Sequence, residues 1–149
     1  MTDTMALTGS TGSTSDATAA RCRITAGTAV GIGLVLLANT AVYLVADAGA
    51  PVEVVTGWEP DGTELRLADV IGAAVTWVVI GAAGLWFLER FRADGFRFWT
   101  VLAAAIAVVS IIPLFRLDID AGSKVALSAM HLVVGATAVA GHALVRARR

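Results

Sequence analysis

Four long apolar stretches, separated by short charged connections, fill most of this chain. They cover residues 24–46, 67–88, 98–115 and 123–145, and each is close to the roughly 20 apolar residues that a helix needs to cross a membrane. Short connections favour antiparallel packing of consecutive helices. The pattern therefore predicts an all-α membrane protein, whose four transmembrane helices form an up-down bundle in a single domain, residues 21–149.

The segments outside the apolar stretches are predicted separately. Residues 1–20 are rich in Ser, Thr, Gly and Ala, and this composition favours a disordered tail. The longest connection, residues 47–66, has short alternating stretches on either side of the turn sequence Glu59-Pro60-Asp61-Gly62. This alternation fits a small β-hairpin and an irregular acidic loop equally well.

The charged side chains give the bundle a direction. Eight of the 11 Lys and Arg residues fall on the side that carries both termini, and Arg66, Arg116 and Lys124 fall on the other side. Basic residues are enriched in cytoplasmic segments of membrane proteins. We therefore expect a multi-pass plasma-membrane protein with both termini in the cytoplasm and an acidic loop outside.

Composition excludes several classes of protein. The chain is 57% hydrophobic and 15% charged, whereas soluble domains are about 45–50% apolar and about 25% charged. A net charge of −1 argues against a nucleic-acid partner. The expected surroundings are the lipid bilayer, with a second copy of the chain or another membrane protein as further possible partners.

A few polar residues interrupt the apolar stretches. Asn39, Tyr43, Thr76, Ser110 and His131 come from all four predicted helices, and a rise of about 1.5 Å per residue places most of them at a similar depth in the outer half of the membrane. Two interpretations are open. The side chains either hold the helices together through hydrogen bonds, or they line a small outward-facing ligand pocket.

Small residues mark the expected helix contacts. Gly27 and Gly31 form a GxxxG pair, and Gly135 and Ala138 lie on the same face of the fourth stretch as His131. Small residues at such spacing let membrane helices approach closely. The GxxxG pair permits contact with either a neighbouring helix or a second copy of the chain.

No cofactor, metal or catalytic site is expected. His131 and His142 share a helix face but lie about 16 Å apart along it, so one chain cannot provide paired axial ligands for haem. The single cysteine, Cys22, excludes paired-thiol chemistry, and two distant histidines do not form a zinc site. No nucleophile, base and orienting acid come together in the pattern.

Several short motifs resemble an uncharacterised family of small four-helix bacterial membrane proteins of unknown function. The motifs cover all four predicted helices but not the tail: Pro51-Val52-Glu53-Val54, Leu67-Ala68-Asp69-Val70, Leu88-Glu89-Arg90, Trp99, Ser110-Ile111-Ile112-Pro113-Leu114 and Met130-His131-Leu132-Val133. The resemblance implies a four-helix fold and membrane location, and no activity.

These observations favour a non-enzymatic membrane protein that interacts with itself, with another membrane protein or with a small lipophilic ligand. A small carrier or channel-like subunit that uses the polar layer is the alternative. A membrane enzyme is the third possibility and has the least support.

Overall fold

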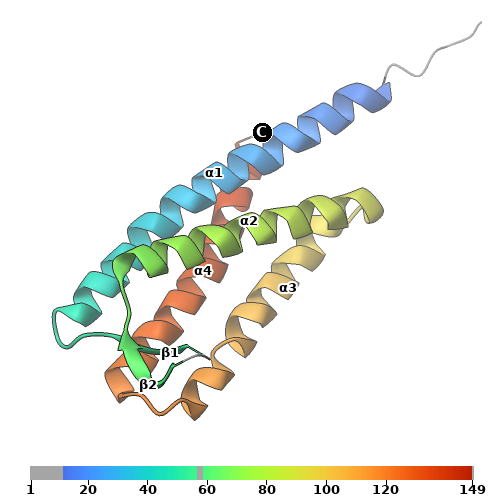
Figure 1. Ribbon diagram of the computed structural model, residues 1–149. Coiled ribbons are helices and arrows are strands. Elements are labelled where there is room, and N and C mark those ends of the chain that lie inside the picture. Colours follow the sequence, from blue (N-terminus) through green and yellow to red (C-terminus); the bar gives the residue numbers. More distant parts are fainter. Residues whose placement is uncertain (1–11, 57–58, 149) are drawn as a thin grey trace, which may run out of the picture.

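The computed structural model describes residues 12–56 and 59–148, and the side chains from residue 18 onward with a gap at residues 55–62. Four long helices and a small hairpin make up the fold (Figure 1). Their bounds are α1 Gly12–Asp47, β1 Glu53–Thr56, β2 Glu59–Glu64, α2 Leu67–Phe91, α3 Gly95–Val109, the 3-10 turn η1 Ile112–Arg116, and α4 Ala121–Ala147.

The predicted all-α membrane fold is confirmed. Each of the four helical segments is long and apolar enough to cross a membrane. Large apolar side chains such as Leu37, Val45 and Phe115 point away from the other helices. Exposure of these apolar faces to water would be unfavourable, but in a bilayer they contact lipid tails of the same polarity.

Helix α1 begins at Gly12, twelve residues before the predicted start at Ile24. The second half of the segment that was expected to be a disordered tail is therefore helical, and residues 1–11 lie outside the described residues. Helix nucleation is costly but extension is not. Ala17, Ala19 and Ala20 are strong helix formers, so the packed part of α1 can extend through them.

The third predicted helix is interrupted. Helix α3 ends at Val109, and residues 112–116 form a 3-10 turn instead of continuing to residue 115 as α-helix. Pro113 has no N–H to donate to the carbonyl of Val109, and its ring clashes with the preceding turn. The chain tightens at once, because the N–H of Ile111 donates to Val108 O at 3.2 Å.

The first loop contains the β-hairpin, so the hairpin alternative is the correct one. Strands β1 and β2 pair antiparallel, with Glu53 opposite Glu64 and Val54 opposite Thr63. The N–H of Leu65 donates to Val52 O at 2.7 Å and extends the pairing. Val52 and Leu65 are buried, so the hairpin covers one end of the bundle.

Helices α1 and α4 form the closest pair, running antiparallel. A Cβ added to Gly141 would lie 2.5 Å from the backbone N of Gly31, and one added to Gly27 would lie 2.7 Å from Cδ2 of His142. Only glycine allows such an approach. The GxxxG pair therefore contacts α4 of the same chain. Gly31 faces Ala138.

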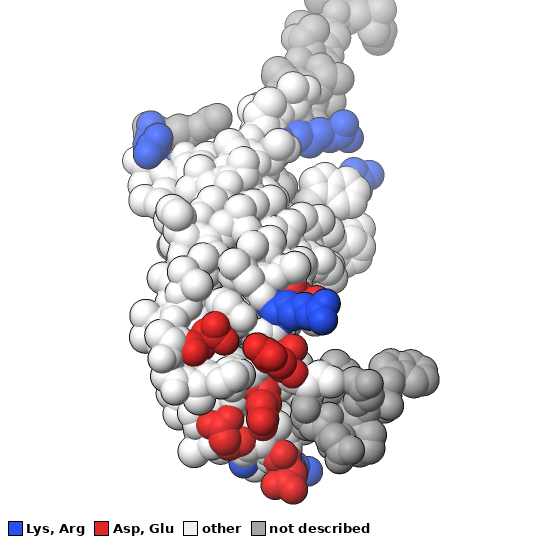
Figure 2. Space-filling model, turned by 60° about the vertical axis from the view of Figure 1, so that its left-hand side comes forward, with Lys and Arg blue, Asp and Glu red and all other residues white. Residues whose placement is uncertain are grey.

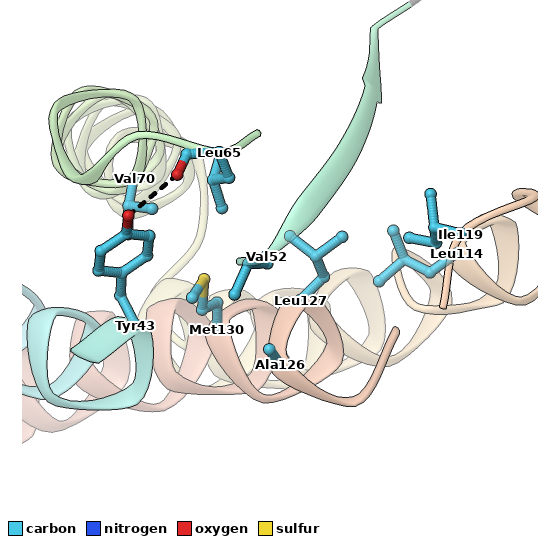
Figure 3. Close-up of a cluster of buried hydrophobic side chains, with 9 residues drawn as sticks. All are labelled: Tyr43, Val52, Leu65, Val70, Leu114, Ile119, Ala126, Leu127 and Met130. Atoms are coloured by element: carbon cyan, nitrogen blue, oxygen red, sulfur yellow. Dashed lines mark hydrogen bonds between the residues drawn. The ribbon is translucent and has the colours of Figure 1, made fainter. Parts of the chain in front are cut away.

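The hydrophobic core has two parts. At the hairpin end, nine buried side chains form one cluster (Figure 3), in which the Tyr43 hydroxyl donates to Leu65 O at 3.0 Å. Toward the termini, a second cluster surrounds Val35, Val78, Leu85 and Trp99. The hairpin contributes to the first cluster, so it is packed on the helices at that end.

Candidate functional site

A groove of about 650 Å³ lies between α2 and α3. These helices meet at their short connection and diverge toward the hairpin (Figure 1). Helix α4 and one residue of α1 form the floor, and Val54 and Leu65 line the hairpin end. Its volume is within the range of about 300–1,000 Å³ that small-molecule sites have.

The walls of the groove are apolar. Helix α2 contributes Trp77, Ile80 and Phe87, and α3 contributes Leu102 and Ile106. The side chain of Trp77 is 59% exposed, which places it on a rim that faces outward from the bundle. The groove is therefore open to the side, where the lipid of a membrane would lie.

Asn39 provides a polar group on the floor. It is only 3% exposed, and its Oδ1 has no hydrogen-bond partner within the part of the chain that the structure describes. An unsatisfied polar group in an apolar environment costs about 1–3 kcal/mol. A bound group that donates a hydrogen bond to Asn39 would remove this cost.

His131 and Ser110 also line the groove. The Nδ1 of His131 lies 2.7 Å from Leu127 O, and this contact requires Nδ1–H to donate. In the neutral ring, Nε2 is then left as an acceptor. The hydroxyl of Ser110 donates to Ala107 O at 2.8 Å. Three of the five residues predicted for a pocket are thus brought together: Asn39, Ser110 and His131.

Tyr43 and Thr76 do not line the groove. Tyr43 is buried in the cluster beneath the hairpin. Thr76 is exposed, and its hydroxyl donates to Gly72 O at 2.8 Å within its own helix. A residue turns about 100° from the next one in an α-helix. Thr76 is two positions from both Ala74 and Val78, which face the core, so it points the opposite way.

Most hydroxyl groups within the helices form hydrogen bonds inside their own helix. Thr28, Thr100, Ser128 and Thr137 each donate to a carbonyl three or four residues earlier in the same helix. Among the described residues, Trp99 forms a hydrogen bond between two helices: its Nε1 donates to Gly81 O at 2.8 Å. Trp99 is 4% exposed, so its ring is enclosed by the surrounding helices.

Trp99 belongs to a set of contacts near the termini that sequence patterns did not reveal. Its ring meets His142 edge-on at 5.2 Å and stacks with Phe96 at 6.0 Å. The guanidinium of Arg146 lies 4.1 Å above the Phe96 ring and forms an ion pair with Glu89. These contacts join α2, α3 and α4. They involve residues far apart in sequence, so spacing gives no signal for them.

The hairpin end is held by Ser123, another residue without a sequence signal. Its hydroxyl accepts from the N–H of Glu53 at 2.9 Å. Asp120 caps α4 and accepts from the N–H of Ser123 at 3.0 Å. Hydrogen bonds from the Ser123 hydroxyl and backbone lower the pKa of the Asp120 carboxyl. One short segment therefore caps a helix and fixes the hairpin over the groove.

Charge is distributed unevenly around the site. On the face in Figure 2, acidic side chains gather toward one end of the bundle, and basic ones lie mainly toward the other. Asp69 stands where α2 begins and lines the groove near the hairpin. Its Oδ2 accepts from the N–H of Arg66 at 3.3 Å. A carboxylate at this position disfavours an anionic ligand.

The two histidines and the other metal-ligating side chains are dispersed in the part of the chain whose side chains are described, residues 18–54 and 63–148. No three His, Cys, Asp or Glu side chains among them come together. His142 is buried behind Trp99 and Gly27, with Nδ1 2.9 Å from Ala138 O. His131 lies in the groove three helical turns away.

Comparison with known proteins agrees with the resemblance found in the sequence. No curated protein and no solved structure matches the chain. The model of a family of unknown function, DUF6069, matches residues 18–148. This range includes all four transmembrane segments, the hairpin and every residue of the groove. The chain therefore belongs to the DUF6069 family.

Proposed function

We propose that this membrane protein binds a small amphipathic molecule in the groove between α2 and α3. The observation that carries the proposal is the unpartnered Oδ1 of Asn39 on the floor of an apolar groove of about 650 Å³. A cavity with apolar walls and few polar groups is the common form of a small-molecule site.

The lining defines the chemistry of the ligand. An apolar body suits the walls formed by Trp77, Ile80 and Ile106. A hydroxyl or amine hydrogen suits Asn39 Oδ1 as a donor, and the free ring nitrogen of His131 is a second acceptor nearby. Asp69 near the hairpin favours a neutral or cationic head over an anionic one.

The ligand reaches the groove from the bilayer. Trp77 on α2 and Ile106 on α3 form its rims, and both are more than half exposed on the surface that faces lipid. The hairpin covers the end of the groove, which restricts direct entry from water. A membrane-dissolved molecule can therefore enter sideways with its apolar part still in an apolar environment.

Quenching of Trp99 by a brominated probe tests this proposal. Trp99 lines the groove yet is 4% exposed, so bulk lipid does not contact it freely. A variant that retains Trp99 alone (Trp58→Phe, Trp77→Phe and Trp86→Phe) is titrated in micelles with 9,10-dibromostearyl alcohol. We expect saturable quenching, and weaker quenching by the methyl ether of the same alcohol, which lacks the donor hydrogen.

A matched pair of substitutions isolates the polar contact. Asn39→Leu should weaken binding of the alcohol about tenfold, since it removes one buried hydrogen bond. Thr76→Val removes a hydroxyl that faces lipid and bonds within its own helix, so it should leave binding unchanged. Quenching that does not saturate, or equal affinities for the alcohol and its ether, would refute the proposal.

We also propose that both termini lie in the cytoplasm and the hairpin outside. The excess of basic residues at the terminal end supports this orientation. In a Cys22→Ser background, Thr63→Cys in β2 should react with a membrane-impermeant maleimide added to intact cells. Reaction only after the cells are opened would reverse the orientation.

A further inference from the structure

Two arginines face each other at the terminal end of the closest helix pair. In the antiparallel α1–α4 contact, Gly27 lies against His142, and Gly31 lies against Ala138. The same register, continued by one turn, brings Arg23 opposite Arg146. This register places two positive charges at the same end of the α1–α4 contact.

The positive charge of this pair is only partly balanced. Glu89 of α2 forms an ion pair with Arg146 and is itself largely buried. Arg23 has no carboxylate partner in the described chain, and its Nε is shielded from water without a hydrogen-bond acceptor. Two adjacent cations therefore share one anion, and one buried donor is unsatisfied. Both conditions are costly unless a further anion is present.

We propose that Arg23 and Arg146 bind a phosphate group, which bridges α1 and α4. A phosphate presents several acceptor oxygens and matches the planar, forked geometry of arginine side chains. The side chain of Arg23 is partly exposed, so an oxygen can reach its terminal nitrogens directly. A small rotation of the guanidinium then lets Nε join in a two-bond contact.

The position of the pair favours the phosphate of an anionic lipid. Arg23 directly precedes the apolar part of α1, which begins at Ile24, and Arg146 directly follows Val145, where the long apolar stretch of α4 ends. Both guanidinium groups therefore lie at the level of lipid headgroups. Basic sites between membrane helices on the cytoplasmic side commonly bind acidic headgroups. Free phosphate has the same chemistry and is the other possible source.

Thermal unfolding of the full-length protein in dodecyl maltoside micelles tests the site. Dioleoylphosphatidylglycerol is titrated against dioleoylglycerol, which has the same tails but no phosphate. A separate titration compares sodium phosphate with sodium chloride at equal ionic strength. A ligand that binds the folded protein raises the unfolding temperature in a concentration-dependent way. We expect saturable stabilisation by phosphatidylglycerol and none by dioleoylglycerol.

Arg23→Gln and Arg21→Gln form the matched pair of variants. Both remove one positive charge at the same end of α1, but Arg21 is exposed and lies on another face of the helix. Arg23→Gln should raise the apparent dissociation constant for phosphatidylglycerol about tenfold or more, whereas Arg21→Gln should change it less than twofold. Without added anion, Arg23→Gln should be at least as stable as wild type, since it relieves a like-charge contact.

A lipid effect that Arg23→Gln weakens and Arg21→Gln retains supports the site with lipid as its source. The same variant pattern with inorganic phosphate supports the site with free phosphate as its source. Equal weakening by both variants would indicate diffuse charge attraction and overturn the proposal. Stabilisation by dioleoylglycerol, or by neither phosphate source, would overturn it as well.

Discussion

Replacement of Gly141 by alanine should force α1 and α4 apart. The added Cβ would lie 2.5 Å from the backbone N of Gly31 and 2.7 Å from the carbonyl oxygen of Gly27. Ordinary contact begins near 3.4 Å, so the two backbones would have to separate by about 0.9 Å. Backbone atoms of a continuous helix cannot move aside individually as a side chain would.

The cost follows from the packing that this separation removes. A gap of about 0.5–1 Å forfeits a quarter to a half of the dispersion energy at each affected contact, and overpacking of this kind costs about 1–3 kcal/mol. Gly31→Ala is different, although Gly31 belongs to the GxxxG pair. Its nearest non-bonded atoms would be 3.5 Å from the new Cβ. We therefore expect Gly31→Ala to lower the free energy of unfolding by less than about 0.5 kcal/mol.

Unfolding in mixed micelles with increasing dodecyl sulfate measures these free energies, followed through Trp99 fluorescence in the background in which the other three tryptophans are replaced by Phe. Helices persist in the unfolded state under such conditions, so the intrinsic preference for Ala over Gly largely cancels. Gly33→Ala is the control, because nothing lies within 4 Å of its added Cβ. Two results would contradict the close packing of α1 against α4. The first is a free energy of unfolding for Gly141→Ala within about 0.5 kcal/mol of that for Gly33→Ala, and the second is a loss for Gly31→Ala as large as that for Gly141→Ala.

Three further predictions concern the hairpin and the helix contacts. Ser123→Ala removes the acceptor for the Glu53 N–H, so hydrogen exchange at that amide should accelerate about fivefold; unchanged exchange would contradict the tether. Trp99→Phe removes the bond to Gly81 O and should cost about 1–2 kcal/mol in thermal unfolding, whereas the exposed Trp86→Phe should be nearly neutral. The bonds to Ser123 lower the pKa of Asp120, so its carboxylate stabilises the fold above the unfolded pKa of about 3.9, and this contribution is lost as pH falls through the lower folded value. The stability difference between wild type and Asp120→Asn should therefore shrink in acid; a difference that stays constant from neutral pH to about pH 2 would contradict this role.

The sequence predicted the helices better than their side-chain contacts. A membrane imposes one strong rule, since backbone groups in lipid must bond within the segment. Long apolar stretches therefore identify helices without knowledge of the neighbours. The third helix was predicted to continue to residue 115 but ends at Val109, and the cause is local, since Pro113 interrupts it. Helix α1 begins at Gly12, before the predicted start, because a polar composition that does not nucleate a helix still allows an existing helix to extend through it.

The candidate site was partly predictable. Asn39 and His131 stand out as polar residues in apolar helices, and both line the groove. The prediction failed for Thr76, because depth along a helix was used without the direction of the side chain. A threonine in lipid satisfies its hydroxyl on its own helix, so a polar residue type does not show that it faces inward.

The sequence by itself determined the number of spans, their membrane location and the family. These properties follow from hydropathy and local motifs, which need no knowledge of how the helices meet. Only the tertiary structure decided that Gly27 and Gly31 face α4, that Trp99 joins α3 to α2, and that α2 and α3 diverge into a groove. Helix packing depends on complementary surfaces of segments far apart in sequence, and periodicity within one segment does not specify its partner.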